Sequence, residues 1–476
     1  MKEKKKKNKG LLIAGIILSI IGIIVTILLA LNIIKLDIIP TKYFSLFIII
    51  EIIGNIIISI LLTRGRVISF IIGLLFLIVL ITGNVIANSY VNTTHKFFIK
   101  SFTSYVLEDI DYIVLTSINN KANTLEETKD TETFYYYKYS KAIDKALKEL
   151  GNHQFSPCDS ISSVLVSFNE NPYNYLVISK GNYEYLIDST NVFTKENYKI
   201  IKEYTINLKE RRNNEVKNSF TVYLNGVDFT GIMRDFNMLI TVNLNKKKIL
   251  LTPILRGYYI DVPAYNIKDT LMCLGSFDSN VSKEALEKLF QTKIDYTVNI
   301  NTNSLVDVVE TLNGVEFCSN YSFTTTHALV LGTYDDKGKE KLYVQQGCRN
   351  YNGIEILTIA RERLHLKNNE RGRIDNCKKI MMSIGKKALT ITSLMNYKEV
   401  LDSIGNLYTT DMNKEMILKL AKMALENPNS FQVEEQTVDG TDSFALGHLG
   451  TVEVGVTIPD YNQVNLASQK INDLLK

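Results

Sequence analysis

The sequence predicts an α/β protein that three N-terminal helices anchor in a membrane. Three long apolar runs open the chain, and short strand and helix patterns alternate after residue 89. Alternation of this kind favours a central sheet flanked by helices, that is, an α/β sandwich. The 476 residues exceed one ordinary domain. We therefore expect a membrane anchor, a small α/β accessory domain and a larger α/β domain.

The three apolar runs extend over Leu11–Leu36, about Tyr43–Leu62 and about Val67–Ala87. Each is long enough to cross a bilayer as a helix, which takes ~20 apolar residues. The first run is longer than the ~7–15-residue core of a signal peptide, and two more runs follow it. The pattern therefore predicts transmembrane helices and not a cleaved leader.

Basic residues predict the orientation of this anchor. Residues 2–9 read KEKKKKNK, and the connection between the second and third runs reads TRGR over 63–66. The positive-inside rule places both in the cytoplasm. Three crossings then put everything after Ser89 outside, so we expect a multi-pass cell-membrane protein with extracytoplasmic soluble domains. The formal net charge of only +4 gives no indication of nucleic acid, and we expect no such partner.

Composition shifts divide the chain into a cytoplasmic basic head over 1–10, transmembrane helices over 11–88, an accessory domain over 89–215 and the larger domain over 216–476. In the accessory domain we expect a helix over Tyr136–Leu150 and strands over Ser163–Phe168, Tyr175–Ser179 and Tyr183–Ile187. In the larger domain we expect strands over Phe220–Leu224, Asn237–Asn243, Ile249–Thr252, Tyr296–Ile300 and Thr451–Ile458, with helices over Val281–Gln291, Ser304–Leu312, Asn413–Glu426 and Tyr461–Leu475.

All five cysteines follow the predicted anchor, where disulfides are permitted. Cys318 and Cys348 flank one insertion-like segment and are the first candidate pair. The odd count leaves at least one cysteine unpaired within the chain. The absence of a C-x-x-C spacing gives no support to a zinc or thioredoxin-like site.

An arginine-rich stretch from Gly353 to Lys387 organises the larger domain. Its apolar spacing predicts two helices joined by a short polar loop. The stretch carries Arg361, Arg363, Glu370, Arg371 and Arg373. Guanidinium groups are always charged and suit a bidentate grip on phosphate. The bland alternative, a solvated charged turn between helices, is about equally consistent with the charge clustering alone.

Two aspartates and one more arginine could meet this stretch. Asp228 and Asp235 lie at predicted strand edges, and Arg256 follows a strand. Two carboxylates without His or Cys partners suit a hard cation such as Mg²⁺, and a ring of arginines around it suits a pyrophosphate. Taken singly, each aspartate also fits a turn or a helix cap. The sequence lacks HExxH, a complete Walker A motif and G-x-S-x-G, which disfavours the enzyme classes that use them.

Several motifs in one order carry a family resemblance. Over about residues 218–476 the chain resembles the LytR–CpsA–Psr (LCP) family of cell-wall glycopolymer ligases, and the anchor with its accessory domain resembles the streptococcal capsule-ligase subgroup. The matching motifs are Tyr223 to Asp228, Arg234 to Asn243, Leu255 to Ile260, Asn352 to Arg363, Glu370 to Lys378 and Pro459 to Val464.

The resemblance implies a function and a set of site residues. Asp228 and Asp235 would hold Mg²⁺. A lipid tail would occupy the apolar core between sheet and helices. The implied reaction transfers a polyprenyl-pyrophosphate-linked glycan, of the teichoic acid or capsule type, to a peptidoglycan hydroxyl and releases polyprenyl phosphate. The residues implied in catalysis are Arg256, Arg361, Arg363, Glu370 and Arg373, of which the four arginines would bind the pyrophosphate.

The chain departs from the family pattern at three positions. Gly257 stands where the family has Asp, Glu370 stands for another Asp, and Cys377 stands for Gln. The alternative is therefore a degenerate member that binds polyprenyl-pyrophosphate lipids or scaffolds wall assembly without transfer. A transcription regulator is disfavoured because only the basic head and one short loop are predicted in the cytoplasm. A gapped pairing of the loop would place Asn368, Arg371 and Asp375 in the family's roles, and we prefer the ungapped one because it keeps the next helix in register.

Overall fold

A computed structural model describes the chain apart from residues 1–7, 102–104, 190–194, 213–214, 229–230, 278–279, 331–337, 389–396, 427–430 and 448–452. The start of the strand expected from Thr451 lies outside the described residues. By packing, the chain forms two compact units, and each is described by itself. The first comprises the described residues of 1–103 and 413–430, and the second those of 104–412 and 431–476.

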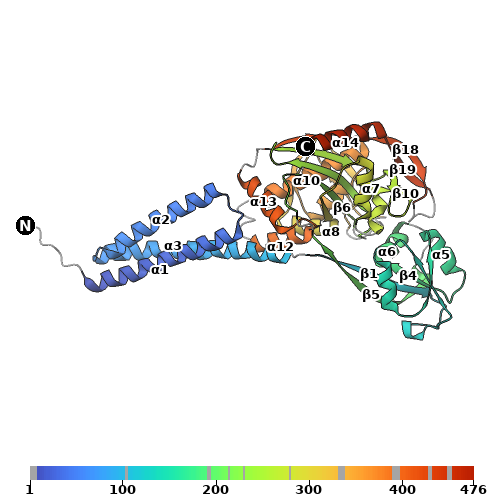
Figure 1. The fold of residues 1–476 in the computed structure, drawn as a ribbon, viewed down its shortest axis with the longest axis horizontal. Helices are drawn as coiled ribbons and strands as arrows, with labels where there is room; N and C mark the ends of the chain where they lie inside the picture. Colours follow the sequence, from blue (N-terminus) through green and yellow to red (C-terminus); the bar gives the residue numbers. More distant parts are fainter. Residues whose placement is uncertain are drawn as a thin grey trace, which may run out of the picture. The chain divides into compact units, whose positions relative to one another are not determined.

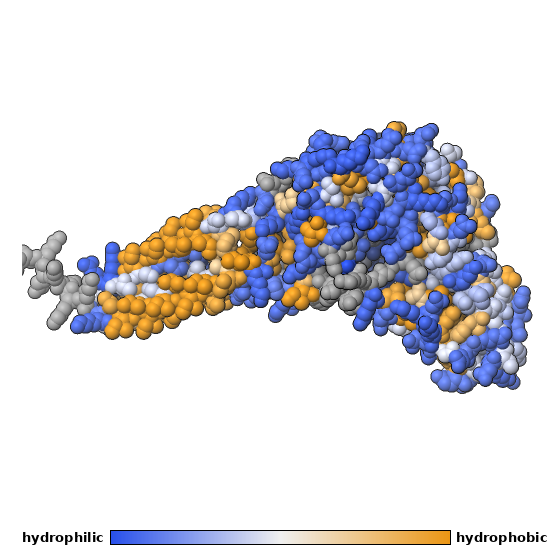
Figure 2. All heavy atoms as spheres, viewed as in Figure 1, coloured by the Kyte–Doolittle hydropathy of each residue, from blue (hydrophilic) through white to orange (hydrophobic). Residues whose placement is uncertain are grey.

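The first unit contains three helices long and apolar enough to cross a membrane, among the described residues. They are α1 (Lys9–Leu36), α2 (Thr41–Thr63) and α3 (Val67–Ser101), which pack pairwise (Figure 1). In the view of Figure 2, apolar side chains cover most of the surface of these helices. The three predicted apolar helices are confirmed, and α3 continues about four turns beyond the expected end at Ala87.

Polar side chains join the three anchor helices. Thr26 of α1 donates a hydrogen bond to Glu51 of α2 at 2.6 Å, and Asn84 of α3 donates to the same carboxylate oxygen at 3.1 Å. Asn55 of α2 donates to the Thr26 hydroxyl at 3.0 Å. Hydrogen bonds of this kind stabilise helix association in lipid, where an unsatisfied polar group is costly.

The N-terminal part of the second unit is the smaller α/β domain. In the described part, its sheet has the strand order β3-β2-β4-β1-β5. The long strands β1 (Tyr105–Ser117) and β5 (Tyr198–Arg211) pair antiparallel. The other elements are β2 (Thr133–Tyr137), α4 (Ile143–Leu150), β3 (Gln154–Cys158), α5 (Ile161–Asn169), β4 (Tyr175–Ser179) and α6 (Lys180–Ser189).

Two strands expected in this domain are wrong. Ser163–Phe168 lies in α5, where Ile161, Val164, Leu165 and Phe168 are buried. These positions follow the i, i+3, i+4, i+7 spacing of a helix, and a capping box between Ser160 and Ser163 begins it. A short apolar segment of this kind also suits a strand, and tertiary packing decides between the two.

The second wrong strand, Tyr183–Ile187, belongs to α6, which follows β4 directly. The helix expected over Tyr136–Leu150 begins only at Ile143, because Tyr136 and Tyr137 pair with β3 as part of β2. The strand over Tyr175–Ser179 is confirmed as β4, whose residues are all buried.

The larger domain is built on a sheet with the strand order β16-β11-β6-β7-β8-β17 among the described residues. The predicted strands and helices are present, with ends that differ by a few residues. The strands are β6 (Ser219–Val227), β7 (Arg234–Asn243), β8 (Lys248–Ile254), β11 (Tyr296–Asn301), β16 (Tyr408–Thr410) and β17 (Gln432–Glu435).

Helices cover both faces of this sheet (Figure 1). Along β6, Tyr223 packs into the cluster that includes α7 and α14, and the next residue, Leu224, packs against Ile374 of α10 on the opposite face. The α/β sandwich is thereby confirmed. Its helices are α7 (Val281–Phe290), α8 (Thr302–Thr311), α9 (Gly353–Arg361), α10 (Asn369–Ala388), α12 (Tyr397–Leu407) and α14 (Tyr461–Leu475).

Small antiparallel ribbons extend the larger domain, and of their strands the sequence predicted only β19, as the strand expected over Thr451–Ile458. They are β9 (Tyr259–Val262) with β10 (Ile267–Thr270), β12 (Val315–Ser319) with β15 (Gly347–Tyr351), β13 (Phe323–Ala328) with β14 (Lys341–Val344), and β18 (Gly440–Ala445) with β19 (Val454–Pro459). Short 3₁₀ helices cover Leu125–Glu127, Lys195–Asn197 and Leu271–Ser276.

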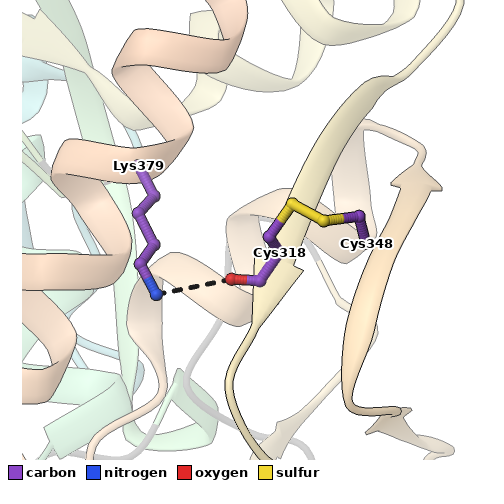
Figure 3. The surroundings of a disulfide bond; sticks show 3 residues. All are labelled: Cys318, Cys348 and Lys379. Carbon is purple, nitrogen blue, oxygen red and sulfur yellow. Dashed lines mark hydrogen bonds between the residues drawn. A yellow bond between two sulfur atoms is a disulfide. The ribbon is translucent and has the colours of Figure 1, made fainter.

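A disulfide joins β12 to β15, as predicted, between Cys318 and Cys348 (Figure 3). The two residues lie directly opposite each other in the ribbon. Lys379 of α10 donates a hydrogen bond to the Cys318 carbonyl at 3.3 Å (Figure 3). The ribbon is thus held covalently across its strands and is attached to the helix that carries Arg373.

Aromatic side chains join the smaller domain to the larger one within the second unit. The rings of Tyr139 and Tyr265 are tilted against each other with centroids 4.5 Å apart, and the ring centroid of Tyr137 lies 6.5 Å from that of Phe277. Such pairs add to the free energy of burying apolar area. A backbone hydrogen bond of 3.2 Å from Lys141 N–H to the Ser276 carbonyl adds a polar contact.

Candidate active site

A cavity of about 380 Å³ lies between one face of the large sheet and helices α8, α9 and α10. Strands β6, β7, β11 and β13 also contribute to its wall. Five charged residues predicted from the sequence line it, namely Asp235, Arg256, Arg361, Arg363 and Arg373. The structure therefore brings together side chains that are up to 138 positions apart in the chain.

Asp235 and Arg256 form an ion pair on the sheet side of the cavity. Asp235 is the second residue of β7, at a register shift opposite Gly226 and Val227 of β6. Arg256 follows the end of β8, the next strand in the sheet. Both side chains keep about a quarter of their surface exposed, so they face the cavity and are not sealed in the core.

Arg373 and Glu370 form a second ion pair, within the first two turns of α10. The Arg373 guanidinium also donates a hydrogen bond to the Asp235 carbonyl, which attaches α10 to β7. Glu370 lies 4.0 Å from the Arg256 Nε as well. The two ion pairs thus form one connected network across the sheet and the helix.

This network changes the ionisation of its members. Burial opposes the charged form of Asp235, but Arg256 and Arg373 outweigh it and hold the pKa of the carboxyl below its ordinary value. Burial likewise opposes ionisation of Glu370, and Arg373 holds its pKa below the ordinary value. Both groups are therefore carboxylates at neutral pH.

Arg361 and Arg363 come from the end of α9 and the residues that follow it. An Asn352–Glu355 capping box begins this helix, and the helix ends at Arg361. Burial and the positive charge of Arg256 lower the pKa of Arg363. In the described part of the chain, Arg363 has no ion-pair partner. Among the described residues that line the cavity, four carry a guanidinium group and one, Asp235, carries a carboxylate. This excess of basic side chains in the wall would favour a bound anion.

Glu362, which is fully buried between these two arginines, fixes the segment that carries them. Its carboxylate accepts hydrogen bonds from the backbone N–H groups of Arg363 and His365, each at 2.9 Å. It also accepts from the backbone N–H of Thr326 in β13 and, at 3.0 Å, from the Thr326 hydroxyl. Burial opposes its ionisation, and these donors hold the pKa of Glu362 below its ordinary value.

The rest of the cavity is apolar. Phe236 of β7, Ile300 of β11 and Leu305 of α8 lie on one side, and Leu357 of α9 and Ile380 of α10 lie on the other. Ala360, Leu364, Met381 and Cys377 complete this part of the wall. The cavity therefore combines a cationic end with an apolar chamber, which suits a ligand with an anionic head and a hydrocarbon tail.

Asp228 is placed differently from Asp235. It follows the end of β6 and is buried, and its carboxylate accepts a hydrogen bond from the Met233 N–H at 3.0 Å. It is not among the described residues that line the cavity. The two carboxylates lie at adjacent ends of β6 and β7 and offer hard oxygen donors, which is the chemistry Mg²⁺ prefers. The chemistry of both side chains therefore suits this ion, but of the two only Asp235 lines the cavity.

Comparison with known proteins decides the family. Residues 183–472, more than half of the chain, match the LytR_cpsA_psr family. The chain belongs to the LytR_cpsA_psr family. The match begins within the smaller domain, earlier than the resemblance suggested at about residue 218.

Named relatives of this LytR_cpsA_psr protein are distant in sequence. The polyisoprenyl-teichoic acid–peptidoglycan teichoic acid transferase TagU of Enterococcus faecalis is 26% identical, over 49% of this chain and 74% of its own length. The corresponding transferase TagT of Bacillus subtilis is 24% identical, over 40% of this chain and 59% of its own length. Biofilm regulatory protein A of Streptococcus mutans is 23% identical, over 46% and 58%.

Solved structures of this family overlap only part of the chain. The crystal structure of B. subtilis TagV has a TM-score of 0.44 at 17% identity, over 55% of this chain and 98% of that one. TagT bound to LI-WTA has a TM-score of 0.41 at 21% identity, over 54% and 91%.

The structure distinguishes the two ways of pairing the arginine loop with the LytR_cpsA_psr motif. Arg371 extends away from the cavity, where it forms an ion pair of 2.8 Å with Asp439 and donates to the Val438 carbonyl. Asp375 forms an ion pair of 2.8 Å with Lys378. Asn368 has a left-handed backbone in the turn before α10. The geometry therefore places Glu370 and Arg373 with the other arginines, as in the ungapped pairing.

Two of the three departures from the LytR_cpsA_psr pattern, Gly257 and Cys377, have different surroundings. The Gly257 carbonyl accepts a hydrogen bond of 2.7 Å from the Thr457 N–H, so this position joins the sheet to β19. Cys377 lines the cavity, and its thiol donates to the Ala360 carbonyl at 3.6 Å. Burial raises the pKa of Cys377 to about 11, so the thiol is neutral at physiological pH.

Sequence reasoning missed three residues of this site. Thr326 and His327 of β13 line the cavity, and Glu362 fixes the neighbouring loop. The β13 strand was not predicted at all, because its FTTTHA sequence lacks an apolar alternation. The sequence did carry a signal for Glu362, because this acidic residue stands directly between Arg361 and Arg363.

Proposed function

We propose that this protein is a membrane-anchored phosphotransferase that moves a glycopolymer from a polyprenyl-pyrophosphate carrier to peptidoglycan. The observation that carries the proposal is one cavity whose net positive end continues into an apolar chamber. Membership of the LytR_cpsA_psr family supports it, as do relatives whose names describe teichoic acid transfer to peptidoglycan.

The four arginines would bind the pyrophosphate. Arg361 and Arg363 extend from the α9 side, and Arg256 and Arg373 are held by Asp235 and Glu370 on the opposite side. In phosphoryl transfer the protein acts mainly by positioning the groups and neutralising charge. The acceptor hydroxyl would attack the glycan-bearing phosphorus, its proton would leave, and the bond to the second phosphate would break to release polyprenyl phosphate.

Asp235 and Asp228 would hold Mg²⁺ in this proposal. The ion would supply further charge neutralisation to the phosphate oxygens when bound. The apolar side chains around Phe236, Leu357 and Ile380 would take the first part of the polyprenyl chain and exclude water from it. Glu362 would keep Arg361 and Arg363 directed at the head group.

The predicted topology supports an extracytoplasmic site. The basic head over 2–9 and the basic connection between α2 and α3 both favour the cytoplasm. The three membrane-length helices then leave the soluble domains on the outer side, where lipid-linked glycan and peptidoglycan meet. The disulfide between Cys318 and Cys348 is in keeping with an oxidising compartment.

A second candidate is a binder that holds the lipid without transfer. The observation that favours it is Cys377, a neutral thiol in the cavity wall where the family carries Gln. A thiol is a weaker hydrogen-bond donor and acceptor than an amide. This candidate would keep affinity for polyprenyl pyrophosphate and lose turnover.

The test uses the full chain in detergent with a polyprenyl-pyrophosphate glycan, a peptidoglycan acceptor and Mg²⁺. The measured quantities are release of polyprenyl phosphate and attachment of glycan. We expect transfer by the parent and a loss of about 10²–10³-fold in Arg361→Ala and in Asp235→Ala, the scale of removing one charge-stabilising group. Arg371→Ala is the matched control, because this arginine faces Asp439 outside the cavity.

Each outcome selects one reading. Transfer that is lost in both variants and kept in the control supports the phosphotransferase. Tight binding of the lipid by the parent without transfer supports the binder, and Cys377→Gln should then restore turnover. If the parent shows neither binding nor transfer with teichoic acid and capsule-type donors, both hypotheses are wrong. Equal transfer with and without a chelator of divalent cations would contradict the role of Mg²⁺ and leave the rest of the proposal intact.

A further inference from the structure

Helix α13 (Lys414–Glu426) occupies an unusual place in the chain. In sequence it connects β16 to β17, which are the two edge strands of the large sheet. In packing, however, it belongs to the compact unit of the three anchor helices. A connection between two strands of one domain that packs with the anchor helices suggests a separate role for α13.

Two polar contacts attach α13 to the turn between α1 and α2. Lys422 forms an ion pair of 2.9 Å with Asp37, the residue that ends α1. Lys42, in the first turn of α2, donates a hydrogen bond of 2.6 Å to the Glu426 carbonyl. The ends of membrane-spanning helices mark the border of the hydrocarbon layer. The C-terminal half of α13 is therefore no farther from that border than a lysine side chain can reach.

The residues of α13 are apolar over most of the helix circumference. Met416 is fully buried and marks the face packed against protein. Leu418 and Leu425 are seven positions apart and share a different face, where Leu425 is 44% exposed. Lysines border this second face on the polar side of the helix, at Lys414 and Lys422.

We propose that α13 lies at the outer surface of the membrane that α1, α2 and α3 cross, with Leu418 and Leu425 among the acyl chains of the phospholipids. Its position at the ends of α1 and α2 identifies the occupant of the exposed apolar face as lipid. Lys422 is paired with Asp37, whereas Lys414 flanks the face as a long basic side chain of the kind that extends toward the phosphates of acidic lipids. Interfacial helices typically bury their apolar side ~5–10 Å into the boundary between head groups and acyl chains.

The sequence makes this proposal easy to test, because the chain contains no tryptophan. Leu425→Trp in the full-length protein introduces a single fluorophore on the proposed face. Tyr173→Trp is the matched control, since Tyr173 is 50% exposed in the smaller domain, far along the chain from any helix of the anchor. Both proteins are reconstituted into vesicles of phosphatidylethanolamine and phosphatidylglycerol, with and without brominated acyl chains.

We expect the Leu425→Trp emission to shift to the blue and to be quenched several-fold more by brominated lipid than the control. Iodide in the water should quench the Tyr173→Trp control more than Leu425→Trp. Bromine near the head-group end of the acyl chain should quench more than bromine near its methyl end. Leu418→Trp repeats the measurement about two helical turns away and controls for a local disturbance at Leu425.

Two results would overturn the proposal. Quenching of both α13 tryptophans by iodide but not by brominated lipid would place the face in water. Quenching by neither reagent would show that protein covers it. The result does not depend on glycan transfer, so the proposed function and this inference can fail separately.

Discussion

The guanidinium of Arg256 forms an ion pair with the carboxylate of Asp235 in the wall of the cavity. The same Asp235 accepts a hydrogen bond from Arg373 at its backbone carbonyl. One residue of β7 thus gathers arginines from the strand beside it and from the helix above it.

Arg373 supports both the stability and the charge of the site. Its side chain is only 6% exposed, and Arg373→Ala would leave Glu370, whose side chain is 18% exposed, without its nearest partner. Removing one member of a buried pair typically costs about 3–5 kcal/mol, and partial exposure of Glu370 places this case at or below the lower end. We expect a clearly lower melting temperature and loss of transfer. Arg371→Ala, two positions away, should change the melting temperature little, and an equal loss there would contradict the assignment.

Ionisation of Asp235 should contribute to stability in a defined pH range. Its pKa is depressed in the folded protein, so the contribution is complete above the unfolded value of ~3.9 and is lost as the pH falls through the lower folded value. We expect the parent to melt at a higher temperature than Asp235→Asn at pH 7, and the difference to shrink below about pH 4. Thermal denaturation in detergent between pH 7 and pH 3 measures this. A difference that grows toward acid pH would show that the sign is wrong.

Glu362 should act as a positioning residue for Arg361 and Arg363. Glu362→Gln keeps the shape but turns an amide N–H₂ toward backbone donors, which costs about 1–3 kcal/mol for an unsatisfied buried group. We expect a lower melting temperature and weaker binding of inorganic pyrophosphate to the full chain, measured by calorimetry.

Glu355→Gln, in the first turn of α9, is the control for this substitution. Glu355 accepts a hydrogen bond from the Asn352 N–H at 2.8 Å in an exposed capping box, a role that Gln also fills. Melting temperature and pyrophosphate affinity should therefore stay close to the parent's. If Glu362→Gln lowered stability but left pyrophosphate affinity intact, Glu362 would be structural and not a positioning residue.

The disulfide should stabilise the ribbon that supports α10. The bond closes a loop with a sequence separation of 30, and a cross-link of this size typically contributes about 2–4 kcal/mol. We expect the double variant Cys318→Ser with Cys348→Ser to melt at a lower temperature under oxidising conditions. Reducing agent should lower the melting temperature of the parent and leave the double variant unchanged. Cys158→Ser, which alters a free thiol, should behave like the parent.

The sequence by itself determined the elements whose residues carry a strong periodic or compositional signal. The three anchor helices followed from apolar runs of membrane length, and α14 was predicted with the bounds Tyr461–Leu475 that the structure has. The two helices on either side of the arginine loop also followed from apolar spacing. In these segments local pattern and final burial agree, so no knowledge of the neighbours was needed.

Only the tertiary structure decided which charged groups meet. Arg371 and Arg373 are two positions apart on α10, which turns their side chains about 200° from each other around the helix. Packing of Ile374 against β6 and β7 sets the rotation of α10, and so directs Arg373 into the cavity and Arg371 toward Asp439. The same cause explains α5 and α6, whose short apolar segments suit either a strand or a helix until the neighbouring sheet selects one face.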